Sequence, residues 1–271
     1  MEDQPGTALI TGSLGGIGHL VVERLAARGH DLILVDLDAD RLAEQASALP
    51  RARALVLDHT DPAAVRAFCT QHLAETRIDI AVLNAGLVAP GPYVERTSTE
   101  IERQLAVNLT APALLLHALG IGMTRQGSGR LVVTVSLGGI VAMKDSAAYA
   151  ASKFGLRGLV LSLRDEWAAQ GVELSAVLPA GVDTPMLRYE ARHGGSSLNF
   201  VGTPVGAEVA ADAILGAIDR PRAEVYVPWA DSLSARLLGA FPWMTRHLAP
   251  LLERLGERGR ARYLARIAGA P

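Results

Sequence analysis

Short runs of β-favouring residues alternate with helix-length amphipathic stretches along most of this chain. The runs are residues 8–11, 31–37, 54–58, 80–84, 130–136 and 173–178, and residues 224–228 can form a last strand. Nearly continuous apolar strands that are separated by helices indicate a parallel sheet covered on both faces. We therefore predict a doubly wound α/β fold, in which ligands bind beyond the carboxyl ends of the strands.

Length and composition favour one domain and exclude some functions. The chain has 271 residues, of which 49% are hydrophobic, and an α/β fold of this size can form a single core. We expect residues 1–228 to form the dinucleotide-binding and catalytic unit and residues 229–271 to form a C-terminal extension. The net charge of −2 argues against nucleic acid as a partner. The single cysteine, Cys69, excludes an intrachain disulfide, and no metal-ligand spacing is present among the histidines.

Two segments bear on the compartment. The acidic start, Met1–Gln4, lacks the positive charge and separate apolar stretch of a secretory signal, so we expect the protein to stay in the cytoplasm. Residues 104–124 carry no Asp, Glu, Lys or Arg and are long enough to cross a bilayer. Because this stretch contains Asn108 and His117, we favour a helix buried in the protein or at a subunit interface.

The first strand leads into a glycine-rich turn, which is followed by an amphipathic helix. Its candidate phosphate-binding residues are Gly12, Ser13, Gly16, Ile17 and Gly18. Glycines let a backbone approach a pyrophosphate, whose charge is favoured at a helix N-terminus. The arrangement is that of a Rossmann-type nucleotide site, although a ligand-free strand-to-helix turn would use similar residues.

Acidic residues at the ends of the next two strands indicate which dinucleotide binds. A carboxylate at Asp36 can accept hydrogen bonds from both ribose hydroxyls of NAD and would repel the 2′-phosphate of NADP. We therefore predict NAD as the cofactor, with capping of a turn or of the next helix as the alternative for Asp36. Asp58 is placed to meet the adenine edge, but it also lies in a plausible helix-capping segment.

Tyr149 and Lys153 are four residues apart, so on a helix they share one face. A free tyrosine titrates near ~10, and a nearby ammonium with an oxidised nicotinamide would lower its pKa far enough for proton transfer. Ser136, at the end of a strand, can hold the substrate oxygen. The chain has 26 Lys plus Arg but only two lysines, Lys144 and Lys153, so a lysine is used where an arginine would not serve. A solvated Tyr/Lys pair is the alternative.

Together these motifs resemble the short-chain dehydrogenase/reductase family over roughly residues 6 to 228. Asn84, Ala85 and Gly86 match most of the family's Asn-Asn-Ala-Gly segment, with Leu83 in place of its first Asn. The resemblance implies that Asn108, Ser136, Tyr149 and Lys153 form the catalytic set, with Asn108 kinking its helix and supporting a proton relay through Lys153. It also implies that Lys153 binds the nicotinamide ribose.

A second part of the resemblance lies after residue 178. The segment from Pro179 to Thr184 is similar to the family's nicotinamide-contacting Pro-Gly-x-Val-x-Thr, with Ala180 in place of the glycine and with Val182 and Thr184 in register. The resemblance further implies a homo-oligomer, a tetramer or dimer formed through residues 101–119 and 147–169. Asn108 as a merely structural polar group stays an open alternative.

The remaining segments suggest a substrate and a docking surface. Apolar residues follow Asn84, Ser136 and Thr184, so we expect a small hydrophobic secondary alcohol or ketone, unless these residues belong to the core or an interface. Residues 220–271 hold nine arginines against four acids, interleaved with Trp and Leu. Such a segment can pack on the domain, on another subunit or on an anionic membrane. Pro242 and Pro250 should break it into short helices. A nucleotide sensor without turnover, or an epimerase or dehydratase, remains an alternative function.

Overall fold

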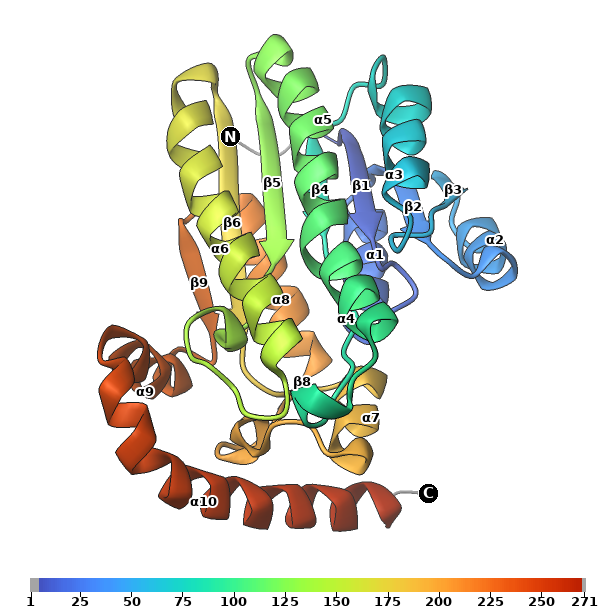
Figure 1. The fold of residues 1–271 in the computed structure, drawn as a ribbon. Coiled ribbons are helices and arrows are strands. Elements are labelled where there is room, and N and C mark those ends of the chain that lie inside the picture. The colour runs from blue at the N-terminus through green and yellow to red at the C-terminus, as the bar shows by residue number, and fades with distance from the viewer. Residues whose placement is uncertain (1–4, 270–271) are drawn as a thin grey trace.

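The structure is a computed structural model that describes residues 5–269, apart from the side chains of residues 245 and 246, so the expectation drawn from Met1–Gln4 lies outside the described residues. Within that range seven strands form one sheet in the order β3-β2-β1-β4-β5-β6-β9 (Figure 1). They are β1 (Thr7–Thr11), β2 (Asp31–Asp36), β3 (Ala52–Val56), β4 (Ile80–Leu83), β5 (Gly129–Thr134), β6 (Val172–Pro179) and β9 (Glu224–Val227). Every neighbouring pair is parallel, which confirms the predicted doubly wound α/β fold.

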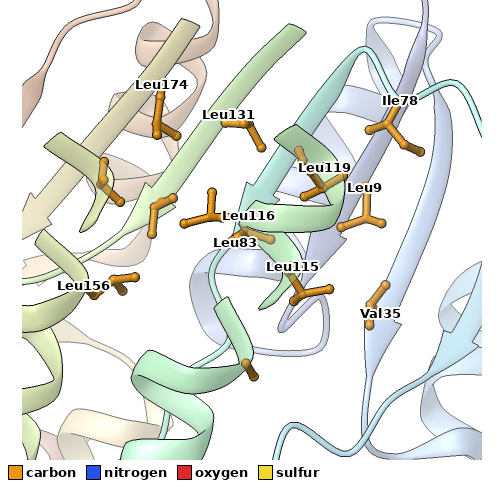
Figure 2. Close-up of a cluster of buried hydrophobic side chains, with 14 of the residues drawn as sticks. Leu9, Val35, Ile78, Leu83, Leu115, Leu116, Leu119, Leu131, Leu156 and Leu174 are labelled. Carbon is orange, nitrogen blue, oxygen red and sulfur yellow. The ribbon is translucent and has the colours of Figure 1, made fainter. Parts of the chain in front are cut away.

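Helices cover both faces of this sheet. One face carries α3 (Pro62–Phe68), α5 (Ala111–Gln126) and α6 (Ala147–Trp167), and the other carries α1 (Gly16–Ala27), α2 (Ala39–Ser47) and α8 (Ala207–Asp219). Figure 2 shows the first core layer, where Leu115, Leu116 and Leu119 of α5 point toward strand residues such as Leu131. Burying a leucine side chain contributes about 2 kcal/mol, so these contacts hold the strand ends in place.

The chain direction across the sheet reverses between β1 and β4. From β1 the chain builds outward through β2 and β3, and it then crosses back to β4 and continues through β5 and β6 to β9. The carboxyl ends of β1 and β4 therefore flank the switch point, where doubly wound sheets bind their ligands. Thr11 joins the two strands there, since its Oγ1 accepts hydrogen bonds from the backbone amides of Asn84 at 3.0 Å and Ala85 at 3.2 Å.

The long uncharged stretch lies in a helix that packs on the sheet. Residues Ser98–Gln126 run through α4 (Ser98–Leu105), a π-helical turn η3 (Ala106–Thr110) and α5, and this helix is long and apolar enough to cross a membrane. Its most apolar window is 44% buried within the protein. The inner side of α5 belongs to the main core through Leu115, Leu116 and Met123.

The chain after β6 builds a cap over the carboxyl ends of the strands. It comprises β7 (Val182–Asp183), α7 (Pro185–His193), the 3₁₀ turn η6 (Ser197–Phe200) and β8 (Val205–Gly206), and the short strands β7 and β8 pair with each other. The shorter turns elsewhere are η1 (Cys69–Leu73), η2 (Tyr93–Glu95), η4 (Leu137–Gly139) and η5 (Ala168–Gln170).

The C-terminal extension forms α9 (Trp229–Ala240) and α10 (Pro242–Ala268), which passes beneath this cap in Figure 1. The prediction that both prolines break the segment was wrong for Pro250, which lies inside α10, whereas Pro242 begins that helix. An interior proline removes one helical hydrogen bond, but packing holds both sides of it. Before Pro250, Met244 packs against Ala235 and Leu238, and after it Leu252 packs against the same cluster and Tyr263 is buried against Phe200.

Candidate active site

A cavity of about 550 Å³ lies at the carboxyl ends of the strands, between the glycine-rich turn and the cap. Most of the predicted site residues line it, namely Gly12, Gly16, Ile17, Asp36, Asp58, Asn84, Ala85, Gly86, Ser136, Tyr149, Lys153, Val182 and Thr184. Ser13, Gly18 and Asn108 are not part of the lining. The fold thus gathers into one space residues that follow β1, β2, β3, β4 and β5, residues of the segment after β6, and residues of α1 and α6.

The glycine-rich turn is shaped so that no side chain fits at two of its positions. Gly12 has a φ of +67°, and a Cβ there would lie 2.9 Å from the backbone of Ala85. A Cβ on Gly18 would lie 2.0 Å from the carbonyl oxygen of Gly12, so α1 packs directly on the turn. No side chain caps the N-terminus of α1, which leaves its first backbone amides for a ligand. The cradle therefore fits a pyrophosphate.

Asp36 binds the turn rather than capping the next helix. Its Oδ2 accepts a hydrogen bond from the amide of Leu14 at 3.0 Å and its Oδ1 accepts one from the amide of Leu37 at 2.8 Å. The helix cap of α2 is Asp38 instead, which accepts from the amide of Arg41. Asp36 therefore keeps acceptor positions toward the cavity. Arg41, one turn into α2, also lines this end of the cavity, and the sequence reasoning missed it.

Asp58 lines the cavity and binds the turn that precedes α3, but it does not cap that helix, and its contact with adenine stays a prediction. Its Oδ1 accepts hydrogen bonds from the amide of Thr60 at 2.8 Å and from the Thr60 hydroxyl at 2.7 Å, which holds the pKa of Asp58 below its usual range. The cap of α3 is Asp61, so Asp58 fixes the turn that precedes the helix while it faces the cavity.

Ser136, Tyr149 and Lys153 converge on the cavity from β5 and α6. Ser136 follows β5, and its side chain hydrogen-bonds Tyr149 and accepts from the amide of Gly138. Lys153 is 4% exposed, its Nζ donates to the carbonyl oxygen of Thr134 at 3.0 Å, and it lies 5.7 Å from the centre of the Tyr149 ring. The shared helix face predicted from their spacing is thus present.

Burial sets the acid–base state of this pair. Burial lowers the pKa of Lys153 to about 8. Burial, together with the nearby Glu190, raises the pKa of Tyr149 to about 12, against the opposing effect of the Ser136 hydrogen bond. The expected lowering of the Tyr149 pKa is therefore absent in the protein alone, because burial has the largest effect. The Lys153 Nζ donates instead to the Thr134 carbonyl oxygen. A positively charged nicotinamide, where bound nearby, would favour the phenolate.

Asn108 lies in the π-helical turn η3, so the predicted irregularity of its helix is present. Its Nδ2 donates to the carbonyl oxygen of Leu87 and its Oδ1 accepts from the amide of Leu87, both at 2.8 Å. Asn108 is 1% exposed and does not line the cavity itself. It fixes the backbone of Leu87, which does line the cavity.

Comparison with known proteins decides the family. Residues 6–194 match the family model described as short chain dehydrogenase. The chain belongs to the short-chain dehydrogenase family. It is an oxidoreductase of the Rossmann-type α/β class, and members of this family use a nicotinamide cofactor.

Several relatives share this assignment. The chain is 34% identical to 1-deoxy-11-beta-hydroxypentalenate dehydrogenase from Streptomyces avermitilis over 262 residues, which cover 92% of this chain and 93% of that protein. It is 34% identical to D-threitol dehydrogenase from Mycolicibacterium smegmatis over 66% of this chain and 71% of that protein. Among solved structures, a short-chain dehydrogenase from Sphingobium yanoikuyae in complex with NADPH has a TM-score of 0.77 and 32% identity, with 90% of this chain and 96% of that chain covered.

This short-chain dehydrogenase departs from the family motifs at two positions, Leu83 and Ala180. Leu83, which replaces an asparagine, is 3% exposed and packs in the core (Figure 2). Asn84 then bonds across the switch point, with its Nδ2 donating to the Gly12 carbonyl at 3.4 Å and its Oδ1 accepting from Thr134 at 3.1 Å. Ala180, which replaces a glycine, extends the backbone pairing of β6 by donating to the Val227 carbonyl.

The substrate end of this dehydrogenase holds residues that the sequence reasoning did and did not find. Leu87, Met186 and Leu187 line the cavity as expected. Phe200 instead packs against α10, and Tyr189 stacks on His193; neither Phe200 nor Tyr189 lines the cavity. Thr184 caps α7 by accepting from the amide of Leu187. Glu190 and Asn199 line the same end of the cavity, and the sequence analysis missed both. Neither residue belongs to a local sequence pattern that would indicate that it faces the cavity.

Proposed function

We propose that this enzyme catalyses the reversible, NAD(H)-dependent oxidation of a secondary alcohol whose body is mainly hydrophobic. The observation that carries the proposal is the convergence of Ser136, Tyr149 and Lys153 on the cavity into which the glycine-rich turn opens. The nicotinamide group, when bound, supplies the acceptor or donor of the hydride. The side chains supply the proton transfer that must accompany it.

Each catalytic side chain has a defined task in this proposal. Ser136 holds the substrate oxygen by hydrogen bonding and keeps it beside the Tyr149 hydroxyl. In alcohol oxidation the Tyr149 phenolate takes the hydroxyl proton, and in ketone reduction the neutral phenol returns it. Lys153 would bind the ribose of the nicotinamide and would pass the proton on toward water near Asn108. Val182 and Thr184 would hold the nicotinamide carboxamide, and Ala85 and Gly86, which line the same cavity, would contact the bound cofactor.

NAD is preferred in this proposal because Asp36 lines the cavity at the end of β2, where a carboxylate favours ribose hydroxyls and repels a 2′-phosphate. Arg41 lines the same end and is the residue that would support NADP. Both oxygens of Asp36 face the loop amides of Leu14 and Leu37, so the carboxylate is held in place. Because the similar Sphingobium dehydrogenase is in complex with NADPH, the first experiment compares NAD with NADP.

The substrate class rests on the lining of the cavity. Leu87, Val107, Met186 and Leu187 present apolar surface next to the catalytic residues. The names of two relatives, D-threitol dehydrogenase and Levodione reductase, support an alcohol or ketone as the reacting group. We propose a small alcohol or ketone substrate of this kind for a cytoplasmic enzyme.

The test is the formation of NADH from NAD with a panel of secondary alcohols, run in parallel with NADP and with the Tyr149→Phe variant. We expect turnover with NAD, weaker turnover with NADP, and a loss of about 100-fold or more in Tyr149→Phe. Equal turnover in Tyr149→Phe would overturn the role of Tyr149. Product formation without any net change in NADH would instead indicate an epimerase or dehydratase.

We propose two further contacts that the alcohol assay does not address. A homo-oligomer would use the outer sides of α5 and α6, where Ile121 and Phe154 are exposed, and light scattering on the purified protein measures its mass. Peripheral membrane contact would use the exposed Trp229, Trp243 and Leu251 of the C-terminal extension. Sedimentation with anionic vesicles tests it.

A further inference from the structure

Glu190 is a buried carboxyl group at the substrate end of the cavity, and the proposed catalytic mechanism does not use it. It lies on α7, is 6% exposed, and lines the cavity together with Asn199 of η6. A carboxyl group removed from water loses several kcal/mol of hydration unless partners replace it, so a buried glutamate in the cavity wall calls for a role.

The protein satisfies only part of the hydrogen-bonding capacity of this carboxylate. Asn199 Nδ2 donates to Oε1 at 2.8 Å, and the backbone amide of Ser196 also hydrogen-bonds the carboxylate. A carboxylate offers about four acceptor positions, so further positions remain for a donor that enters from the cavity. Burial raises the pKa of Glu190 to about 7, which indicates that these two partners do not fully replace water.

Glu190 also lies close enough to the catalytic tyrosine to influence it. Its negative charge opposes ionisation of Tyr149, whose pKa is raised in part by Glu190. A molecule whose alcohol carbon reacts beside Tyr149 therefore has Glu190 in the wall of the same cavity. Met186 and Leu187 belong to the same helix and provide the apolar surface there.

We propose that Glu190, supported by Asn199, binds a second hydroxyl group of the substrate, so that the enzyme prefers diols and hydroxyketones with an apolar body. This inference rests on the proposed function and adds a polar anchor to the substrate class. It makes Glu190 a specificity residue, distinct from the residues that hold the reacting oxygen.

The charge near Glu190 favours a neutral hydroxyl over an ammonium group as the donor. Arg260 of α10 reaches this region, donates a hydrogen bond to the carbonyl oxygen of Gly195, and stabilises the Glu190 carboxylate electrostatically. An ammonium group bound to Glu190 would meet that like charge in a poorly solvated space. A hydroxyl donates one hydrogen bond without adding charge.

A purely structural role is the competing explanation. Glu190 lies against Gly195, where an added Cβ would clash with its side chain, and it ties α7 to η6 through Asn199. A tie of this kind would change the stability of the cap and the binding of all ligands alike. Only a binding role changes the ratio between a diol and the matching mono-alcohol.

The test measures binding and turnover of cyclohexanol and of the 1,2-, 1,3- and 1,4-cyclohexanediols. Binding is measured by calorimetry with NAD in the Tyr149→Phe background, where turnover is blocked, and turnover is measured in the protein with Tyr149 intact. Each is repeated with Glu190→Leu, with Glu190→Gln, which keeps the shape of the side chain, and with Glu102→Gln as a control on the exposed side of α4.

We expect at least one diol to bind about 10- to 100-fold more tightly than cyclohexanol when Glu190 is present, as for a hydrogen bond to a charged group. The ratio should fall to about 2-fold or less in Glu190→Leu, fall partly in Glu190→Gln, and stay unchanged in Glu102→Gln. Equal binding of diols and cyclohexanol, or a ratio that survives in both Glu190 variants, would overturn the inference and leave the proposed function standing. A diol preference in binding with no NADH formed from any alcohol would overturn the proposed function instead.

Discussion

The pH dependence of stability offers a quantitative test of how Glu190 is buried. Its pKa is raised from 4.5 to about 7 in the folded protein, mainly by burial. Between these two values the unfolded chain releases the proton while the folded protein keeps it, so stability falls as the pH rises. At 1.36 kcal/mol for each pH unit, the loss from pH 5 to pH 8 is about 2–3 kcal/mol.

Glu190→Gln imitates the protonated acid and removes this titration. We therefore expect the wild type to lose about 2–3 kcal/mol more stability than Glu190→Gln between pH 5 and pH 8. With a urea m-value of about 3 kcal/mol/M, the difference is roughly 1 M in the unfolding midpoint. Taking the difference between two pH values cancels any constant loss from an altered hydrogen bond to Asn199 or Ser196, and it cancels the other groups that titrate in both proteins.

Urea unfolding followed by circular dichroism at the two pH values measures the effect. Parallel loss of stability in the two proteins would refute the reasoning, because it would mean that Glu190 is well solvated or fully paired in the folded state. A larger loss in Glu190→Gln would mean that the folded protein stabilises the carboxylate, with its pKa below 4.5, contrary to the burial seen here.

Three further variants test the cofactor site and the catalytic lysine. Lys153→Arg should lower kcat about 100-fold or more, because a guanidinium does not fit the buried site from which Nζ reaches Thr134. The control Lys144→Arg, on the surface, should leave kcat unchanged. Near-normal turnover of Lys153→Arg would refute the ammonium role. Asp36→Ala should weaken NADH binding and raise the affinity for NADPH relative to NADH by about 10-fold, as measured by fluorescence titration. An unchanged affinity ratio would count against Asp36 as the residue that selects NADH. Gly18→Ala should reduce stability by about 1–3 kcal/mol and weaken NADH binding, since its Cβ would lie 2.0 Å from the Gly12 oxygen. The matched Gly122→Ala, where nothing lies within 4 Å, should be neutral or stabilising by up to about 1 kcal/mol in thermal unfolding, and equal losses would argue against the close packing.

Local patterns in the sequence were sufficient to predict the framework of this enzyme. Continuous apolar runs predict parallel strands, because only a strand covered on both faces needs to be apolar throughout. The glycine-rich turn and the four-residue spacing of Tyr149 and Lys153 are equally local, since they depend on the backbone of one turn and one helix. These elements lie where they were predicted, with strand ends differing by a residue or two.

Other features depend on contacts between distant segments, and only the tertiary structure decided them. The sequence did not predict that Arg41 would face the cavity, that Asn108 would clamp Leu87, or that packing on both sides would let α10 continue through Pro250. Glu190 is the clearest case, because a glutamate in an amphipathic helix is ordinarily solvated. Its burial and its raised pKa result from α10 and η6 folding over it, and both lie outside its local sequence. The sequence therefore determined the sheet and the residues at its edge, whereas the packing of η6 and α10 against α7 decided which polar group lies buried in the cavity wall.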